Sequence, residues 1–234
     1  MKKLVIMITK LRNKLNFTSV LVASTFFLFS TLSSITKAED RFFYQLGASY
    51  VEGNSHSNFT PNGTGIPFAG NIEGHRLDFG IGLSSEIKKI KVDYILSYSP
   101  DAFGNQVDTT NACPNPSTEC RVNIKDSLDL GVKFYLPSNA SKITPTIYFG
   151  VSNADIQIKT FKLAGAQMMS HQRNWGGTAG LGLNYDLNNN TAISLDYSWT
   201  AYEKNSEFIN SNLQESAKSR PEINSLALKL KKYF

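Results

Sequence analysis

Apolar residues alternate with small or polar residues along most of the chain after residue 40, which is the two-residue period of a β-strand. In the clearest run, Leu77, Phe79, Ile81 and Leu83 form one face and Arg76, Asp78, Gly80 and Gly82 form the other. Similar runs begin near residues 42, 90, 124, 143, 175, 192 and 223. The pattern predicts eight strands of about ten residues, which cover roughly 23 Å when tilted by about 45°. That length matches the apolar band of an outer-membrane barrel.

The intervals between successive strand starts alternate between long and short: 33, 15, 34, 19, 32, 17 and 31 residues. An up-and-down barrel with tight turns on one rim and long loops on the other produces this alternation. The predicted fold class is all-β: an eight-stranded antiparallel up-and-down transmembrane β-barrel with four long extracellular loops. The expected turns are Ser85–Lys89, Pro137–Lys142 and Asp186–Thr191, and the expected loops are Glu52–Gly74, Pro100–Asn123, Ala154–Asn174 and Tyr202–Glu222.

Alternation alone does not say which face meets lipid, because a soluble lipocalin-like barrel has the same period with its large apolar side chains inside. Glycines favour the membrane barrel. They lie on the polar face, where a narrow lumen needs them to make room for large side chains such as Tyr135 and Tyr148. The apolar face would then contact lipid.

Charged residues of both signs share the polar face with the glycines, and buried charges need partners. We predict that Asp93 pairs with Lys133 and that Asp196 pairs with Lys229, because these residues lie on adjacent strands at similar depth. The residues expected to form the lumen charge pairs are Arg76, Asp78, Asp93, Asp129, Lys133, Asp196 and Lys229, and Lys91 and Lys231 lie on the same face.

The first 38 residues have the features of a secretory signal: a basic start, an apolar run over Val20–Leu32 and a small residue, Ala38, at the end. We expect cleavage after Ala38, which leaves residues 39–234 as the barrel. The alternative is a membrane anchor, but the apolar run is shorter than the roughly 20 residues that a spanning helix needs.

The signal also accounts for the basic character of the chain. It contains six of the 24 basic residues, so 18 remain in the mature part against 19 acidic residues. The pI of about 9.1 is therefore no argument for nucleic-acid binding.

Little in the sequence indicates catalysis. His56, His75 and His171 have no metal-ligand spacing, and no serine, histidine and acid can be placed together on one strand face. We predict no enzyme activity, no cofactor and no metal site. Cys113 and Cys120 are expected to form a disulfide in an exported protein, with two free thiols as the alternative.

One stretch resembles a known family. Trp175–Leu187, the Asn-rich turn 188–190 and the strand Ile193–Tyr197 resemble the penultimate hairpin of the opacity-protein and OmpA/OmpX-type small outer-membrane barrels. In that family the last strand ends on an aromatic residue that is read by the barrel-assembly machinery. Here Lys232 stands at the third position from the end, where an aromatic residue is usual. The resemblance implies an assembly signal formed by Leu226, Leu228, Leu230 and Phe234.

Two function classes fit an outer-membrane barrel of this size. The first is a surface antigen or adhesin, because long loops on a rigid barrel usually bind partners. The second is a structural or small-pore barrel. The long loops contain apolar residues among polar ones, a composition that often marks a binding site. The alternative is that these apolar residues pack on each other and lengthen the barrel. We expect contacts with a host or cell-surface macromolecule, besides outer-membrane lipid, through Phe59, Phe161, Met168, Met169 and Phe208.

Overall fold

The computed structural model describes the backbone of residues 40–60, 66–87, 89–100, 107–109, 118–137, 142–162, 167–210 and 215–234. It describes their side chains too, except at 55–60, 66–70, 107–109, 118–121, 158–162, 167–171, 205–210 and 215–219. The expected signal, residues 1–38, lies outside the described residues. In the described part of the chain, no helix is long and apolar enough to cross a bilayer.

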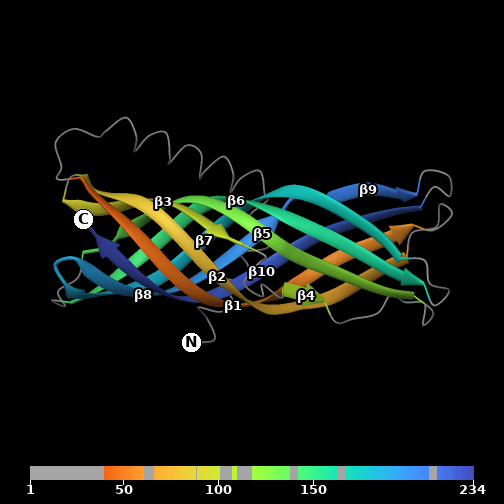
Figure 1. Ribbon diagram of the computed structural model, residues 1–234, viewed down its shortest axis with the longest axis horizontal. Helices are drawn as coiled ribbons and strands as arrows, with labels where there is room; N and C mark the ends of the chain where they lie inside the picture. The colour runs from red at the N-terminus through yellow and green to blue at the C-terminus, as the bar shows by residue number, and fades with distance from the viewer. Residues whose placement is uncertain are drawn as a thin grey trace, which may run out of the picture.

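Eight long strands form a closed antiparallel barrel (Figure 1). Each of them pairs with the next long strand along the chain, and the last pairs with the first, which closes the cylinder. The predicted eight-stranded up-and-down barrel is therefore confirmed. The strands are β1 (Arg41–Thr60), β2 (Ile66–Ile87), β3 (Ile90–Ser99), β5 (Thr118–Tyr135), β6 (Ile143–Lys162), β7 (Gln167–Asn188), β8 (Thr191–Tyr202) and β10 (Glu215–Tyr233).

The two rims differ in the way that the sequence intervals indicate. On one rim β2 ends at Ile87 and β3 begins at Ile90, and β7 and β8 meet in an equally tight turn. Lys89 has a φ of 69°, the left-handed conformation that a two-residue hairpin turn requires. We call this rim the turn side. On the opposite rim two short strands, β4 (Val107–Thr109) and β9 (Asn205–Asn210), lie in the connections after β3 and β8.

The predicted extent of the long loops is wrong, because most strands continue beyond the expected barrel. β1 and β2 stay paired up to Phe59 and Ile66, and β6 and β7 up to Phe161 and Gln167. Most of Glu52–Gly74 and Ala154–Asn174 is therefore strand. Outward apolar residues stop where lipid would end, whereas backbone pairing between strands needs no lipid. We call these strand ends the strand extension: residues 52–60, 66–74, 107–109, 118–124, 155–162, 167–174, 205–210 and 215–222.

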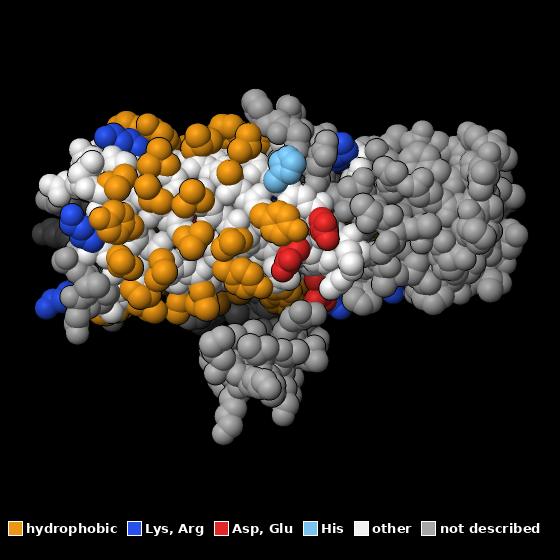
Figure 2. Space-filling view, turned by 90° about the horizontal axis from the view of Figure 1, so that it is seen from below, with side chains coloured by type: hydrophobic (Ala, Val, Ile, Leu, Met, Phe, Trp, Pro, Cys, Tyr) orange, Lys and Arg blue, Asp and Glu red, His pale blue; other side chains and the backbone are white. Residues whose placement is uncertain are grey.

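Large apolar side chains cover the outer face between the turns and the strand extension (Figure 2). Leu181 and Leu228, for example, are 60% and 59% exposed. Exposed aromatic residues lie at both ends of this band: Tyr44, Tyr185 and Phe234 on the turn side, and Tyr50, Tyr98 and Trp175 near the strand extension. An apolar band between two aromatic girdles is the surface that a barrel presents to a bilayer.

Candidate functional site

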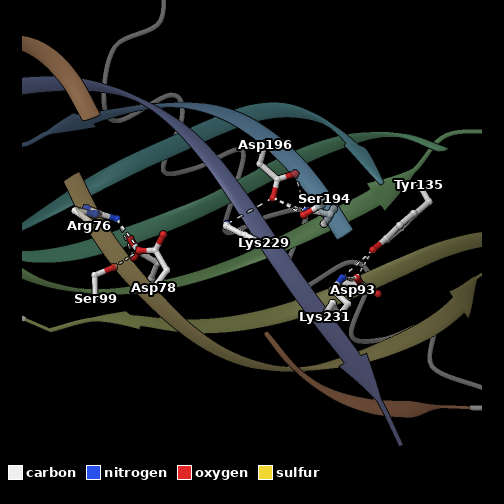
Figure 3. Close-up of polar contacts among 11 residues, drawn as sticks. Arg76, Asp78, Asp93, Ser99, Tyr135, Ser194, Asp196, Lys229 and Lys231 are labelled. Atoms are coloured by element: carbon white, nitrogen blue, oxygen red, sulfur yellow. Dashed lines mark hydrogen bonds and ion pairs between the residues drawn. The ribbon is translucent and has the colours of Figure 1, made fainter. Parts of the chain in front are cut away.

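The lumen contains a buried ion network at its centre (Figure 3). Lys133 on β5 donates hydrogen bonds of 2.8 Å to both carboxylate oxygens of Asp196 on β8. The ammonium group of Lys229 lies 3.6 Å from Asp196, and the hydroxyl of Ser194 donates to the same carboxylate at 3.1 Å. Asp196 therefore connects three strands, β5, β8 and β10.

A second network lies nearer the strand extension. The guanidinium of Arg76 is 3.4 Å from Asp78 and 4.0 Å from Asp129. Ser99 donates to Asp78, and Ser127 donates to Asp129 at 3.1 Å. One arginine thus serves two carboxylates, each of which also accepts a hydrogen bond from a serine hydroxyl.

A third network lies toward the turn side. Lys231 forms an ion pair with Asp93, and Tyr135 donates a 2.6 Å hydrogen bond to the same carboxylate. Lys231 also donates to the Tyr135 hydroxyl at 2.8 Å. Lys231 was expected on the lumen face from the β10 alternation, but no partner was predicted for it.

The structure brings together one of the two expected charge pairs. Asp196 and Lys229 lie close, as their adjacent strands suggest. The prediction that Asp93 pairs with Lys133 is wrong. These two residues are direct neighbours in the β3–β5 register, yet Lys133 points to Asp196 and Asp93 binds Lys231. In an eight-stranded barrel the lumen is narrow enough for side chains to meet across it, so adjacency in the sheet does not decide the pairing.

Apolar clusters close the lumen on both sides of these networks. The cluster toward the strand extension is at most 2% exposed and consists of Val51, Ile72, Val122, Ile124, Ala154, Ile156, Tyr202 and Ile223. The cluster on the turn side consists of Phe43, Ile95, Ala192 and Tyr233, with Tyr148 packed against it. We call them the extension plug and the turn plug. Between them a cavity of about 60 Å³ adjoins the central charges, enough for a few water molecules.

The sequence analysis missed the extension plug because several of its residues fall inside expected loops. The signal was nevertheless present: Ile72 continues the inward set of Arg76 and Asp78 at the correct two-residue spacing. An inward face that changes from charged to apolar, while the outward face changes from apolar to polar, marks the point where a membrane barrel continues into water.

The wall of the strand extension is incompletely paired. β3 ends at Ser99. In the strand extension, among the described residues, only the three-residue β4 bridges β2 and β5. On the other side, β9 pairs with β10 alone and has no described backbone pairing with β7. Among the described strands, the extension is therefore one sheet in the order β7–β6–β5–β4–β2–β1–β10–β9, in which β5 and β2 are joined only through β4. β7 and β9 lie side by side, but among the described residues they form no backbone ladder with each other.

The predicted loop contacts cannot be placed as side chains. Phe59, Phe161, Met168, Met169 and Phe208 lie in strands of the extension, but their side chains lie outside the described residues. The same holds for Cys120 on β5, and Cys113 lies outside altogether, so the disulfide stays a prediction. No group of three or more His, Cys, Asp or Glu residues in the described part is placed to hold a metal ion.

The residues of the predicted assembly signal lie on the outer face of the last strand. Leu226, Leu228 and Leu230 are exposed, and the ring of Phe234 packs on Tyr44 at 5.5 Å. Tyr233 points inward instead and packs edge-on against Phe43 at 5.7 Å in the turn plug. The aromatic residue that is shifted by one position from the family pattern is thus part of the lumen closure.

No protein-family model and no curated protein matches the sequence. Solved structures do match. A major outer membrane protein from Thermus thermophilus is 10% identical, with a TM-score of 0.50 over 84% of this chain and 100% of that one. Neisserial surface protein A is 14% identical, with a TM-score of 0.44 over 82% and 97% of the two chains. The attachment invasion locus protein Ail of Yersinia pestis is 14% identical, with a TM-score of 0.36 over 80% and 98%. The similarity to the Thermus protein shows a shared fold.

Proposed function

We propose that this protein is an outer-membrane surface barrel that binds a macromolecular partner through its strand extension. In this proposal residues 1–38 direct export, the barrel-assembly machinery inserts the chain, and the apolar band lies in outer-membrane lipid. The turn side faces the periplasm, and the strand extension stands outside the cell. The proposal rests on the observation that the strands continue past the lipid-facing band and that, among the described residues, β7 and β9 do not pair with each other.

The edges of β7 and β9 suggest how the partner is bound. An extended polypeptide can add to the edge of a sheet through backbone hydrogen bonds, with side-chain pockets supplying specificity. β7 and β9 do not pair with each other among the described residues, and their facing edges supply backbone groups for this purpose. We therefore propose an extended segment of a host or neighbouring-cell protein as the partner, with Phe161, Met168 and Met169 on the β6–β7 hairpin as contact residues, supported by Phe59 and Phe208.

The alternative function, a structural barrel or small pore, has less support from the interior. Three ion networks and two apolar plugs occupy the lumen, and the described cavity of about 60 Å³ lies between the plugs. A water column through the barrel would require both plugs to move.

The test is attachment of cells that display trimmed barrels. Replacing residues 159–169 by an Asn-Gly turn removes a hairpin tip in register, because Lys159 pairs with Met169. The matched control replaces residues 60–65 of the β1–β2 tip by the same turn and keeps Phe59, which pairs with Ile66. We expect the first variant to lose attachment and the control to keep it, while both remain heat-modifiable on gels. Undiminished attachment of the first variant would refute the proposed binding edge.

A further inference from the structure

One lumen cation, Lys91, has no carboxylate partner in the part of the chain that the structure describes. Each of the four lumen aspartates forms an ion pair with Arg76, Lys133, Lys229 or Lys231. Lys91, at the start of β3, faces the same lumen, but no carboxylate among the described residues lies within 4.0 Å of it. Asp93 and Asp186 act on Lys91 electrostatically from farther away. Among the described residues, Lys91 is therefore a lumen cation outside any ion pair.

A second cation lies beside the same aromatic ring as Lys91. The Arg41 guanidinium lies 5.0 Å from the centre of the Tyr233 ring, and the Lys91 ammonium lies 4.6 Å from the same centre. Lys91 also donates a 2.9 Å hydrogen bond to the Tyr233 hydroxyl. Arg41 donates to the backbone oxygen of Asn189 at 2.9 Å and to the side-chain oxygen of Asn190 at 2.6 Å. These bonds fix both cations around one aromatic ring.

The arrangement leaves donors available to a ligand. A guanidinium has five N–H donors and an ammonium has three, and the hydrogen bonds described here use only two of the former and one of the latter. Both side chains are partly exposed, and the turn plug behind them is buried. A solute can therefore reach them from the turn side without crossing the barrel.

We propose that this turn-side mouth, formed by Arg41, Lys91 and Tyr233, binds an oxyanion of the phosphate type. Arginine and lysine donors at fixed positions suit the several acceptor oxygens of a phosphate. The mouth lies at the depth of the Tyr44 and Phe234 girdle, which is where lipid phosphates are found around such a barrel. The phosphate is supplied either by free inorganic phosphate or by the headgroup of an inner-leaflet phospholipid.

The experiment uses the folded barrel labelled with ¹⁵N. In the first arm, inorganic phosphate is titrated against chloride at equal ionic strength in a neutral maltoside detergent. In the second arm, the fraction of phosphatidylglycerol in phosphatidylcholine nanodiscs is raised stepwise, so that this arm also gives a midpoint. The readout is the chemical shift of the backbone amides of Arg41, Lys91 and Tyr233. Lys91→Gln removes the unpaired cation, and Lys142→Gln is the matched control because it removes one exposed charge from the same rim.

We expect saturable shifts in at least one arm, with the midpoint raised at least fivefold by Lys91→Gln and changed less than twofold by Lys142→Gln. Shifts with free phosphate assign a soluble ligand, and shifts with phosphatidylglycerol alone assign a lipid headgroup. Lys91→Arg should retain binding and thus exclude a folding defect. The proposal is overturned if neither arm gives shifts, or if Lys91→Gln responds like the parent.

Discussion

Asp196 has a larger structural role than any other described lumen carboxylate, since it accepts hydrogen bonds from Lys133 and Ser194 and pairs with Lys229. Asp196→Ala would leave a buried lysine without its counterion, a change that commonly costs about 3–5 kcal/mol. We expect the folded, heat-resistant band on gels to unfold at a clearly lower temperature. Urea unfolding in detergent would give the free-energy change directly.

A surface ion pair supplies the control. Asp126 lies 2.7 Å from Arg173, whose side chain is 52% exposed. Pairs of this kind contribute about 0–1 kcal/mol, so Asp126→Ala should shift the transition only slightly. Equal losses in the two variants would mean that the central network does not hold the barrel together.

The cysteines give a second prediction at this scale. A bridge between Cys113 and Cys120 would close a short loop and stabilise it by roughly 2–3 kcal/mol in the chain-entropy model. Alkylation without reduction, followed by mass spectrometry, should find both cysteines unmodified by the reagent. Two alkylated cysteines would establish free thiols instead.

For the lumen charges, the sequence predicts the face on which a residue lies but not its partner. The two-residue period placed Asp93, Lys133 and Asp196 correctly on the lumen face. It could not pair them, because the partner of Lys133 lies across the barrel on β8 and alternation contains no information about side chains that meet through the lumen.

At the scale of strands, β5 and β6 show how glycine shapes the lumen. Gly131 and Gly150 are direct neighbours in the register of these strands, and the Tyr148 ring occupies the space beside them. A Cβ atom on Gly131 would overlap this ring. Gly131→Ala should therefore destabilise the barrel by about 1–3 kcal/mol, as overpacking does.

A double-mutant cycle in urea tests this cause. The loss from Gly131→Ala should be much smaller in a Tyr148→Ala background, where the ring is absent. Tyr148→Phe is the matched control: it keeps the ring and should keep most of the loss. If the cost is the same in all three backgrounds, strand propensity and not overlap with Tyr148 is responsible.

Strand identity and order were predictable, whereas strand length was not. The short connections after β2 and β7 fall where the turn residues indicated. The ends of β1 and β2 in the strand extension were not predicted. Beyond Tyr50 the outward positions include Glu52 and Asn54, whose exposed polar side chains no longer produce an apolar alternation.

The whole barrel combines two environments along one axis. In the lipid-facing part the outside is apolar and the lumen is charged, and in the strand extension the lumen is apolar at the extension plug. The inversion follows from the solvent outside: where water replaces lipid, the apolar side chains must face inward. A barrel built in this way is closed twice, once by each plug.

Two closures in series lead to the last prediction. In planar bilayers the parent barrel should show no steady conductance, since ions would have to pass both plugs and the charge networks between them. Tyr202→Ala opens the extension plug alone, and the pair Phe43→Ala and Tyr233→Ala opens the turn plug alone. We expect neither variant to conduct steadily and the combination of all three substitutions to conduct, because only then does a continuous polar path remain. Single-channel recordings should be made on samples whose folded fraction has been checked by heat modifiability. A steady large conductance in the parent would show that the plugs open in the membrane, and the pore function would then replace the surface-binding function as the better account of this barrel.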